Sequence, residues 1–311
     1  MKVVTLVHNY VSFKRSLGMR YRSQAHVLEA FARHTGNVEI DEVTVPAARS
    51  FIAGRGPVTA SWHQRHAALN GLYRFAVSRD IVALSPLPLI CPKRPPERTP
   101  HIYSVEELRR LIAATACLTT HTCPSRGTTF GVLLTLLYGS ALRIGEALAL
   151  TLNDVSLSDR LLTVRETKFY KQRWVPIGPQ LTTVLKTHIR QRSRRLYDGQ
   201  HSALLAGESG RRLSYSHVRT LFRQVRREAR VICDGGPKAQ PRLHDFRHTA
   251  AVHRVVHWYR TGKDVQRLLL PLATFLGHIS IVSTQRYLTM TPELLHHAAR
   301  RFEGYAWGGL Q

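Results

Sequence analysis

The sequence of 311 residues is poor in cysteine and in acidic residues, and it has no long apolar run. Its four cysteines form no CxxC pair, so we expect reduced thiols rather than a disulfide framework or a zinc ribbon. No stretch approaches the about 18 consecutive apolar residues of a membrane helix, and no apolar signal-peptide core follows MKVVTLVHNY. These absences argue against a membrane protein and predict a cytoplasmic one.

The charge of the chain is strongly unbalanced. It has 45 Lys and Arg against 20 Asp and Glu, which gives a formal net charge of +25. Such an excess repels itself unless a polyanion neutralises it, which favours nucleic acid or an anionic membrane surface as the partner. Because long apolar runs are lacking, the membrane is the weaker choice and nucleic acid is the expected partner. Because 43% of the residues are hydrophobic, the chain can also bury a sizeable core.

A change in composition divides the chain. The stretch CPKRPPERTPHIYS is rich in proline and charge, which is typical of an extended linker. We predict a domain over 1–90, a linker over 91–103 and a second domain over 104–311. About four helices describe the first domain. One should start at Thr44 and end at Gly54, and another carries an apolar stripe of Trp62, Leu69, Leu72, Phe75 and Ala76.

The second domain combines helical and strand patterns. Ser104 and Glu107 form a capping box, and GTTFGVLLTLLYGS predicts a core helix bounded by Gly139. LLTVRETKFYKQRWVPIG alternates, which predicts a hairpin with strands near 161–166 and 173–177. A later helix buries apolar positions and leaves five basic ones outside: Arg219, Arg223, Arg226, Arg227 and Arg230. The predicted fold class is mainly α with a small β-hairpin.

The segment LHDFRHTAA allows two interpretations. His244 and His248 are four apart and could hold zinc, whereas His244 and Arg247 are three apart and could hold a phosphate. A zinc-protease helix needs a glutamate after the first histidine, but Asp245 stands there. Arg143, in SALRIGEALAL, is a second candidate for a phosphate because it precedes a helix start. A phosphate site is therefore the stronger prediction, with neither metal nor cofactor.

Four motifs in order resemble those of the tyrosine recombinases, the phage-integrase family. They are ALRIGEAL, a lysine in a β-hairpin, LHDFRHT and LGHISIVSTQRYL. The resemblance covers nearly the whole chain, since residues 1–90 are similar to that family's helical core-binding domain. It implies a two-domain, C-shaped clamp around duplex DNA. It also implies a homotetramer on recombination sites, possible accessory DNA-bending proteins, a place at the nucleoid and a mobile-element origin.

The resemblance assigns roles to six residues. Arg143 and Arg247 would bind the scissile phosphate, and Tyr287 would attack it to give a 3′-phosphotyrosyl bond. His244 would manage the proton of the nucleophile, and His278 would hydrogen-bond the phosphate. Lys168 would protonate the leaving 5′-oxygen, with Lys171 as its competitor. A phenol, with a reference pKa of about 10, leaves more readily than a sugar alkoxide, so the protein–DNA bond can be resealed without ATP or metal.

Other features stay open at this stage. Glu146, Asp245 and His248 are expected to orient their neighbours or support the structure. Pro271 should end one helix and start another, with Gly277 leaving His278 just past its end. A C-terminal helix over 291–302 should dock onto a neighbouring protomer, and the alternative is that it docks onto its own domain. The rival functions are a type IB topoisomerase and a DNA-binding protein of the same fold that has lost catalysis.

Overall fold

The computed structural model describes residues 1–55, 58–96, 98–165, 172–193, 199, 201–278, 280–285, 287 and 299. The chain forms two compact units, Met1–Arg98 and Thr99–Gln311. The boundary falls inside the predicted linker. Among the described residues, no helix has the length and apolar character needed to cross a bilayer.

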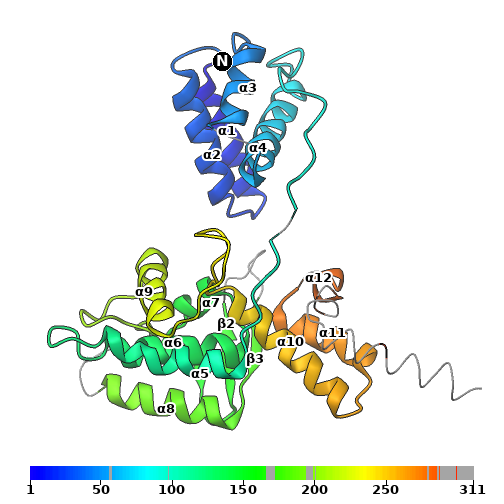
Figure 1. Cartoon of the computed structure of the whole chain (residues 1–311). Helices are drawn as coiled ribbons and strands as arrows, with labels where there is room; N and C mark the ends of the chain where they lie inside the picture. The colour runs from blue at the N-terminus through cyan, green and yellow to red at the C-terminus, as the bar shows by residue number, and fades with distance from the viewer. Residues whose placement is uncertain are drawn as a thin grey trace, which may run out of the picture. The chain divides into compact units, whose positions relative to one another are not determined.

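In its described residues, the N-terminal unit contains four helices (Figure 1): α1 (Val3–Ser16), α2 (Arg22–Thr35), α3 (Val45–Ala53) and α4 (Ala60–Val77). Thr44 caps α3 by accepting a hydrogen bond from the Ala47 amide at 3.3 Å, and Gly54 ends it with a φ of +61°. Leu69 and Leu72 of the predicted stripe are fully buried, while Trp62 is only partly buried. The N-terminal helix bundle is therefore as expected.

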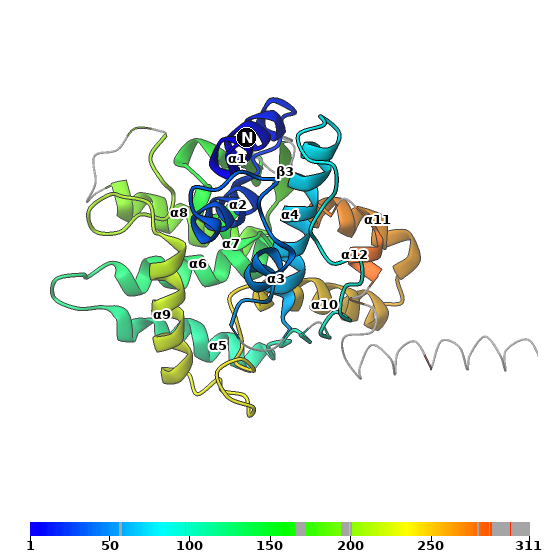
Figure 2. The same cartoon turned by 90° about the horizontal axis from the view of Figure 1, so that it is seen from above.

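The C-terminal unit surrounds one apolar helix. In sequence order it contains α5 (Val105–Ala114), η1 (Thr115–Leu118), α6 (Arg126–Ser140), α7 (Ile144–Ala149), η2 (Leu152–Asp154), β1 (Val155–Ser156), β2 (Leu161–Val164), β3 (Arg173–Pro176), α8 (Pro179–Ser193), α9 (Tyr215–Glu228), α10 (Asp245–Arg260), α11 (Val265–Leu276) and α12 (Val282–Gln285). Helix α6 packs against α5, α8 and α10 and supplies much of the core. Figures 1 and 2 both place α10, α11 and α12 together, away from α9.

The strands form a three-stranded antiparallel sheet in the order β1-β2-β3. Leu162 faces Val175 across β2 and β3, and both side chains are fully buried. The predicted hairpin is therefore present. Lys168 and Lys171 lie between its strands, at positions outside the described residues, as does the predicted helix over 291–302 apart from its residue 299.

Two predicted helix ends are wrong. Helix α6 continues through Gly139 to Ser140, and Ala141 ends it with a φ of +51°. Helix α11 runs through Pro271 without a break. A proline removes one bond, to the carbonyl four residues earlier, and here that is Arg267, whose side chain is 88% exposed. This position therefore lies on the solvent side of the helix, while Leu269 and Leu272 hold both sides of the proline in the core.

Candidate active site

The N-terminus of α10 presents the LHDFRHT segment. Asp245 is fully buried and accepts hydrogen bonds from the Arg242 amide at 2.8 Å and from its Nη2 at 3.0 Å. Phe246 is also fully buried, so these two neighbours fix the first turn of the helix. His244 stands at the N-cap position without a side-chain capping hydrogen bond, and Arg247 follows in the first turn, on the face that both residues share.

Arg247 is a buried cation with two backbone partners. Its side chain is 2% exposed, and it donates to the carbonyl of Ala141 at 2.7 Å and to that of Leu276. Burial and then the charge of Arg143 lower its pKa to about 10. Within the described part of the chain no carboxylate forms an ion pair with it. The site thus holds a positive charge that an anion can neutralise.

Arg143 meets Arg247 at the end of α11. It caps α7, its Nη1 and backbone amide both bind Glu146 at 2.9 Å, and its Nη2 donates to the Gly277 carbonyl at 3.1 Å. Arg247 and Arg143 therefore bind the carbonyls of consecutive residues, Leu276 and Gly277. Because the Arg143 side chain is 42% exposed, solvent and solutes can reach this pair of guanidinium groups.

Four aromatic rings continue the site. The ring centroids of His244 and His248 are 4.8 Å apart, those of His248 and Tyr287 5.6 Å, and those of Tyr287 and His278 6.0 Å. Gly277 ends α11 in the left-handed region, so His278 follows the helix end as predicted, and its Nδ1 lies 2.7 Å from the Thr284 hydroxyl. Tyr287 is 2% exposed and belongs to the core cluster of α10 and α11.

The surroundings of two histidines of this group favour the neutral imidazole, because the pKa of each is lowered. Burial, and then the charge of Arg247, lowers the pKa of His244, although part of its side chain is exposed. Burial, and then His244, lowers the pKa of His248 to about 4. A neutral imidazole has one nitrogen that can accept a proton. The arrangement thus places a proton acceptor beside two fixed cations.

The arrangement of His244 and His248 does not support the zinc interpretation. His244 and His248 meet edge to face, with an interplanar angle of 86°. Over the residues that the structure describes, no group of three His, Cys, Asp or Glu side chains could hold a metal ion. His248 instead packs between His244 and Tyr287, which fits the structural role expected of it.

Sequence reasoning missed Arg173, the first residue of β3. Its Nη1 and Nη2 donate to the two carboxylate oxygens of Glu146 at 3.0 and 2.8 Å. Burial alone would raise the pKa of Glu146, but the hydrogen bonds and charges of Arg173 and Arg143 outweigh it and hold that pKa at about 2. Glu146 therefore stays ionised and links both arginines. No local pattern signals this contact, because its partners lie on different elements.

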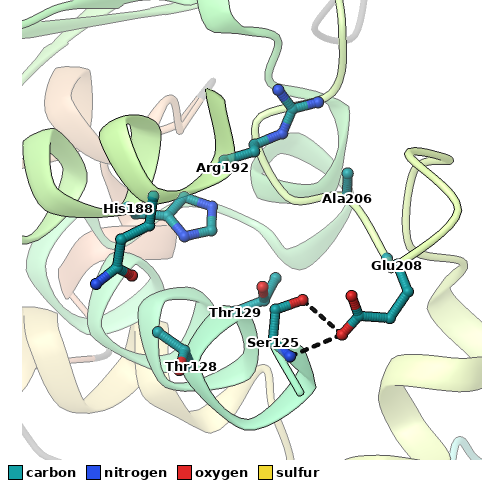
Figure 3. Close-up of a pocket in the computed structure, with 9 residues that line it drawn as sticks. Ser125, Thr128, Thr129, His188, Arg192, Ala206 and Glu208 are labelled. Carbon is teal, nitrogen blue, oxygen red and sulfur yellow. Dashed lines mark hydrogen bonds between the residues drawn. The ribbon is translucent and has the colours of Figure 1, made fainter. Parts of the chain in front are cut away.

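A separate polar pocket lies at the start of α6 (Figure 3). Its volume is about 160 Å³, and residues from α6, α8 and the 206–208 segment line it. Glu208 accepts hydrogen bonds from the amide and hydroxyl of Ser125, at 2.7 and 2.6 Å, and so caps α6. Of the predicted catalytic residues that the structure describes, none lines this pocket, and its acidic group caps the helix.

Known proteins share this architecture. Structures of a lambda integrase dimer bound to a COC′ core site and of the Tn1549 transposon integrase with a circular intermediate DNA align with TM-scores of 0.66 and 0.67. Their identities are 15% and 17%, and the alignments cover 92% and 95% of this chain and 77% and 99% of those chains. The fold is thus that of the two-domain tyrosine recombinases.

Sequence comparison narrows the class to a family. The model of the Phage integrase family matches residues 104–293. Two putative integrase/recombinases of Sinorhizobium fredii (strain NBRC 101917 / NGR234), y4rB and y4rE, are 32% and 34% identical to this chain. These alignments cover 96% and 95% of this chain and 96% and 94% of the relatives. Tyrosine recombinase XerC of Lacticaseibacillus casei is 24% identical over 94% of the chain and 95% of its own length. The chain belongs to the phage integrase family.

Proposed function

We propose that this protein is a site-specific DNA recombinase that cleaves and rejoins duplex DNA through a 3′-phosphotyrosyl intermediate. The observation that carries the proposal is the convergence of Arg143 and Arg247 on consecutive carbonyls, Leu276 and Gly277. The next residue, His278, stacks on the ring of Tyr287 at 6.0 Å. Two guanidinium groups, a phenol and imidazoles are therefore gathered around one position, which suits a scissile phosphate.

The arginines would stabilise the transition state. In-line attack on a phosphodiester places negative charge on the non-bridging oxygens, and planar guanidinium groups neutralise it with directed bonds. Arg247 is already desolvated and fixed by two carbonyls, so it need not reorganise as the charge develops. Arg143 is held by Glu146 and stays exposed on one side, where DNA can approach.

Tyr287 would supply the nucleophile. Its oxygen attacks phosphorus, the bond from phosphorus to the 5′-oxygen breaks, and the DNA 3′-phosphate becomes joined to the protein. His244, neutral and on the same face as Arg247, would accept the phenol proton. His278, whose orientation Thr284 fixes, would donate to a phosphate oxygen. Because the Tyr287 side chain is 2% exposed, DNA must displace part of its surroundings before attack.

The leaving group needs a general acid. An alkoxide leaves poorly unless it is protonated as the bond breaks. We assign this proton to Lys168, with Lys171 as the alternative. Strands β2 and β3 flank both lysines and pack through Leu162 and Val175, so the hairpin base is fixed in the core. Arg173, which follows this segment, joins the base to Glu146 and Arg143.

The proposed partners are double-stranded recombination sites bound by a tetramer of this chain. We propose residues 1–90 as the core-binding domain and 104–311 as the catalytic domain. Basic residues exceed acidic ones in both parts, with 14 Lys and Arg against 6 Asp and Glu over 1–100 and 31 against 14 beyond, which supports contact with DNA by both. A mobile-element origin is consistent with the named likeness to a transposon integrase and with the two Sinorhizobium integrase/recombinases. The protein would then act in the cytoplasm, at the nucleoid.

A nicked suicide substrate tests the proposal. Loss of a short strand after cleavage traps the covalent complex, which migrates as a protein–DNA adduct. The wild type should form the adduct in the presence of EDTA, and Tyr287→Phe should bind the same DNA without forming it. Adducts that persist in Tyr287→Phe, or a wild type that needs added zinc, would contradict the assignment.

A further inference from the structure

A second group of chemically active side chains lies outside the proposed DNA-cleaving site. Cys233, on the segment between α9 and α10, has its Sγ 3.5 Å from Nδ1 of His101. The other ring nitrogen, Nε2, lies 3.2 and 3.3 Å from the two carboxylate oxygens of Glu107. The three side chains thus form a continuous thiol–imidazole–carboxylate series within the C-terminal unit.

Hydrogen-bond logic fixes the direction of this series. Glu107 also accepts the Ser104 amide at 2.7 Å as part of the α5 capping box, so its carboxylate acts as an acceptor. Nε2 of His101 must then carry the proton that it shares with Glu107. In the neutral ring Nδ1 is therefore an acceptor, and it faces the thiol. A nucleophile beside a base that a third group orients is the arrangement that activates weak nucleophiles.

The other described features around Cys233 point to reactivity rather than to metal binding. His101 sits between the sulfur and the carboxylate, so the three donors do not converge on one point, and no metal-holding group of three occurs among the described residues. Cys233 is partly exposed, and the side chains of His101 and Glu107 are 22% and 21% exposed, so a small reagent can reach the group.

We propose that Cys233 is a nucleophilic thiol, activated by His101 and Glu107, and that it is a modification site for soft electrophiles such as hydrogen peroxide. The sulfur attacks one peroxide oxygen, a sulfur–oxygen bond forms and the oxygen–oxygen bond breaks. Sulfur loses two electrons and becomes a sulfenic acid. The thiol proton passes to His101 and then to the departing hydroxide, which leaves as water.

The position of Cys233 links this chemistry to the candidate active site. Gln240 clamps the segment, since its side chain accepts from the Cys233 amide at 3.3 Å and donates to the Cys233 carbonyl at 2.6 Å. Immediately beyond Gln240, Arg226 binds the Pro241 carbonyl at 2.8 Å, and Arg242 binds Asp245. An adduct on Cys233 would disturb this clamp and, through it, the segment that carries His244 and Arg247.

Cys91 offers a matched control within the chain. It is exposed, and its Sγ lies 3.7 Å from both ring nitrogens of His66. Nε2 of His66 faces the Pro88 carbonyl at 3.2 Å instead of a carboxylate. Cys91 therefore has the histidine without the acid. If simple exposure governed reactivity, Cys91 would react faster than the less exposed Cys233.

The test measures the reaction of each cysteine in the full chain with limiting iodoacetamide at pH 7, by peptide mass spectrometry. Cys233 should react at least about tenfold faster than Cys91, because a positioned base accelerates the attack. His101→Gln should remove most of this advantage. Glu107→Gln should lower it too, although glutamine can still complete the α5 capping box. Equal rates at the two cysteines, or an unchanged rate at Cys233 in His101→Gln, would overturn the proposal.

A second measurement follows the oxidation itself. After peroxide treatment, a dimedone trap should label Cys233 in the wild type and label it much less in His101→Gln. Treated wild type should form fewer adducts on the suicide substrate, whereas treated Cys233→Ser should match its untreated form. Equal inhibition of both proteins would refute the link to the active site. A failure of the DNA-cleavage proposal would show differently, as an untreated protein that forms no adduct while Cys233 still reacts rapidly.

Discussion

Arg173 binds both carboxylate oxygens of Glu146, at 3.0 and 2.8 Å, while the same carboxylate binds the guanidinium and backbone amide of Arg143 at 2.9 Å. The side chains of Arg173 and Glu146 are 14% and 12% exposed, so the pair is largely desolvated. Arg143 is therefore oriented by a carboxylate that a strand residue holds in place.

Replacing Arg173 should disturb the orientation of Arg143 while Arg143 keeps its charge. Arg173→Gln leaves Glu146 with one cationic partner, and breaking a buried pair should lower the free energy of unfolding by about 2–4 kcal/mol. Cleavage of the suicide substrate should fall at least about tenfold, because a misplaced Arg143 loses transition-state contacts. Urea unfolding and single-turnover cleavage measure the two effects.

Arg165 supplies the control for this substitution. It pairs with buried Asp154, but its side chain is 47% exposed, and among the described residues no hydrogen bond or ion pair joins either partner to Arg143, Glu146 or Arg247. Arg165→Gln should lower stability less and leave cleavage unchanged under conditions in which both variants are folded. If Arg165→Gln slows cleavage as much as Arg173→Gln does, Arg173 has only a structural role.

Contacts between residues close in sequence could be predicted, whereas contacts between distant residues could not. The Ser104–Glu107 capping box involves residues three apart, so a short pattern in the sequence predicted it. Arg173 reaches Glu146 only after the sheet has formed. The alternating pattern predicts that Arg173 lies in a strand, but it does not indicate which residue its side chain binds.

The errors at helix ends have a similar cause. Local propensity places a stop at Pro271, but core packing on both sides of it keeps α11 continuous. Ala141 takes a left-handed conformation that glycine usually adopts, and its carbonyl binds Arg247 at 2.7 Å. The tertiary contact with Arg247 therefore outweighs the preference of alanine for a negative φ at this position.

Arg247→Lys should nearly abolish cleavage without preventing DNA binding. A lysine keeps the charge, but it cannot bind the carbonyls of Ala141 and Leu276 and a phosphate in the fixed geometry of a guanidinium. Loss of one preorganised donor typically costs about 10²–10³ in rate, so we expect a reduction of that size. Suicide-substrate kinetics and a gel-shift affinity test it, and a cleavage rate within a few-fold of wild type would refute the role of Arg247.

His248 should make folding sensitive to mild acid. Its pKa is about 4 in the folded protein, against 6.5 for an ordinary histidine. Between these values the unfolded chain binds a proton that the folded chain does not, so stability should fall as pH decreases from about 6.5 to 4. After allowance for the part of the ring that water reaches, the loss should be about 1–2 kcal/mol.

The variant His248→Gln checks this assignment by urea unfolding at pH 7.5, 6.0 and 5.0. The dependence on pH should become shallower, though not flat, since the pKa of His244 is also lowered. Glu146 affects stability in a lower pH range. Because its pKa is lowered from 4.5 to about 2, its stabilising contribution is lost only as the pH falls below 4.5. An unchanged slope in His248→Gln would show that another group titrates.

The general acid can be identified with a modified leaving group. A 5′-phosphorothiolate leaves with little need of a proton, so a variant that lacks only the acid should recover most of its rate on this substrate. We expect this rescue for Lys168→Ala and not for Lys171→Ala. Single-turnover cleavage of matched oxygen and sulfur substrates decides between them, and rescue of Lys171→Ala alone would transfer the role to Lys171.

Gly277 should be needed both for its left-handed backbone conformation and because Arg173 leaves no room for a Cβ there. Its φ is +65°, and a Cβ there would lie 2.9 Å from Cζ of Arg173, a side chain that Glu146 prevents from moving freely. Gly262 has nearly the same φ, +68°, with nothing within 4 Å of an added Cβ. Gly262→Ala should therefore cost only the left-handed strain, about 1–2 kcal/mol, without slowing cleavage. Gly277→Ala should cost more and slow cleavage, because it displaces Arg173.

The excess cost can be assigned to Arg173 by combining substitutions. In an Arg173→Ala background the clash is absent, so Gly277→Ala should cost no more than Gly262→Ala does. Urea unfolding of the single and double variants gives the coupling between positions 173 and 277, and contacting residues typically couple by about 0.5–3 kcal/mol. A coupling near zero would mean that the turn before His278 is positioned independently of Arg173. Arg173 would then be linked to Arg143 through Glu146 only.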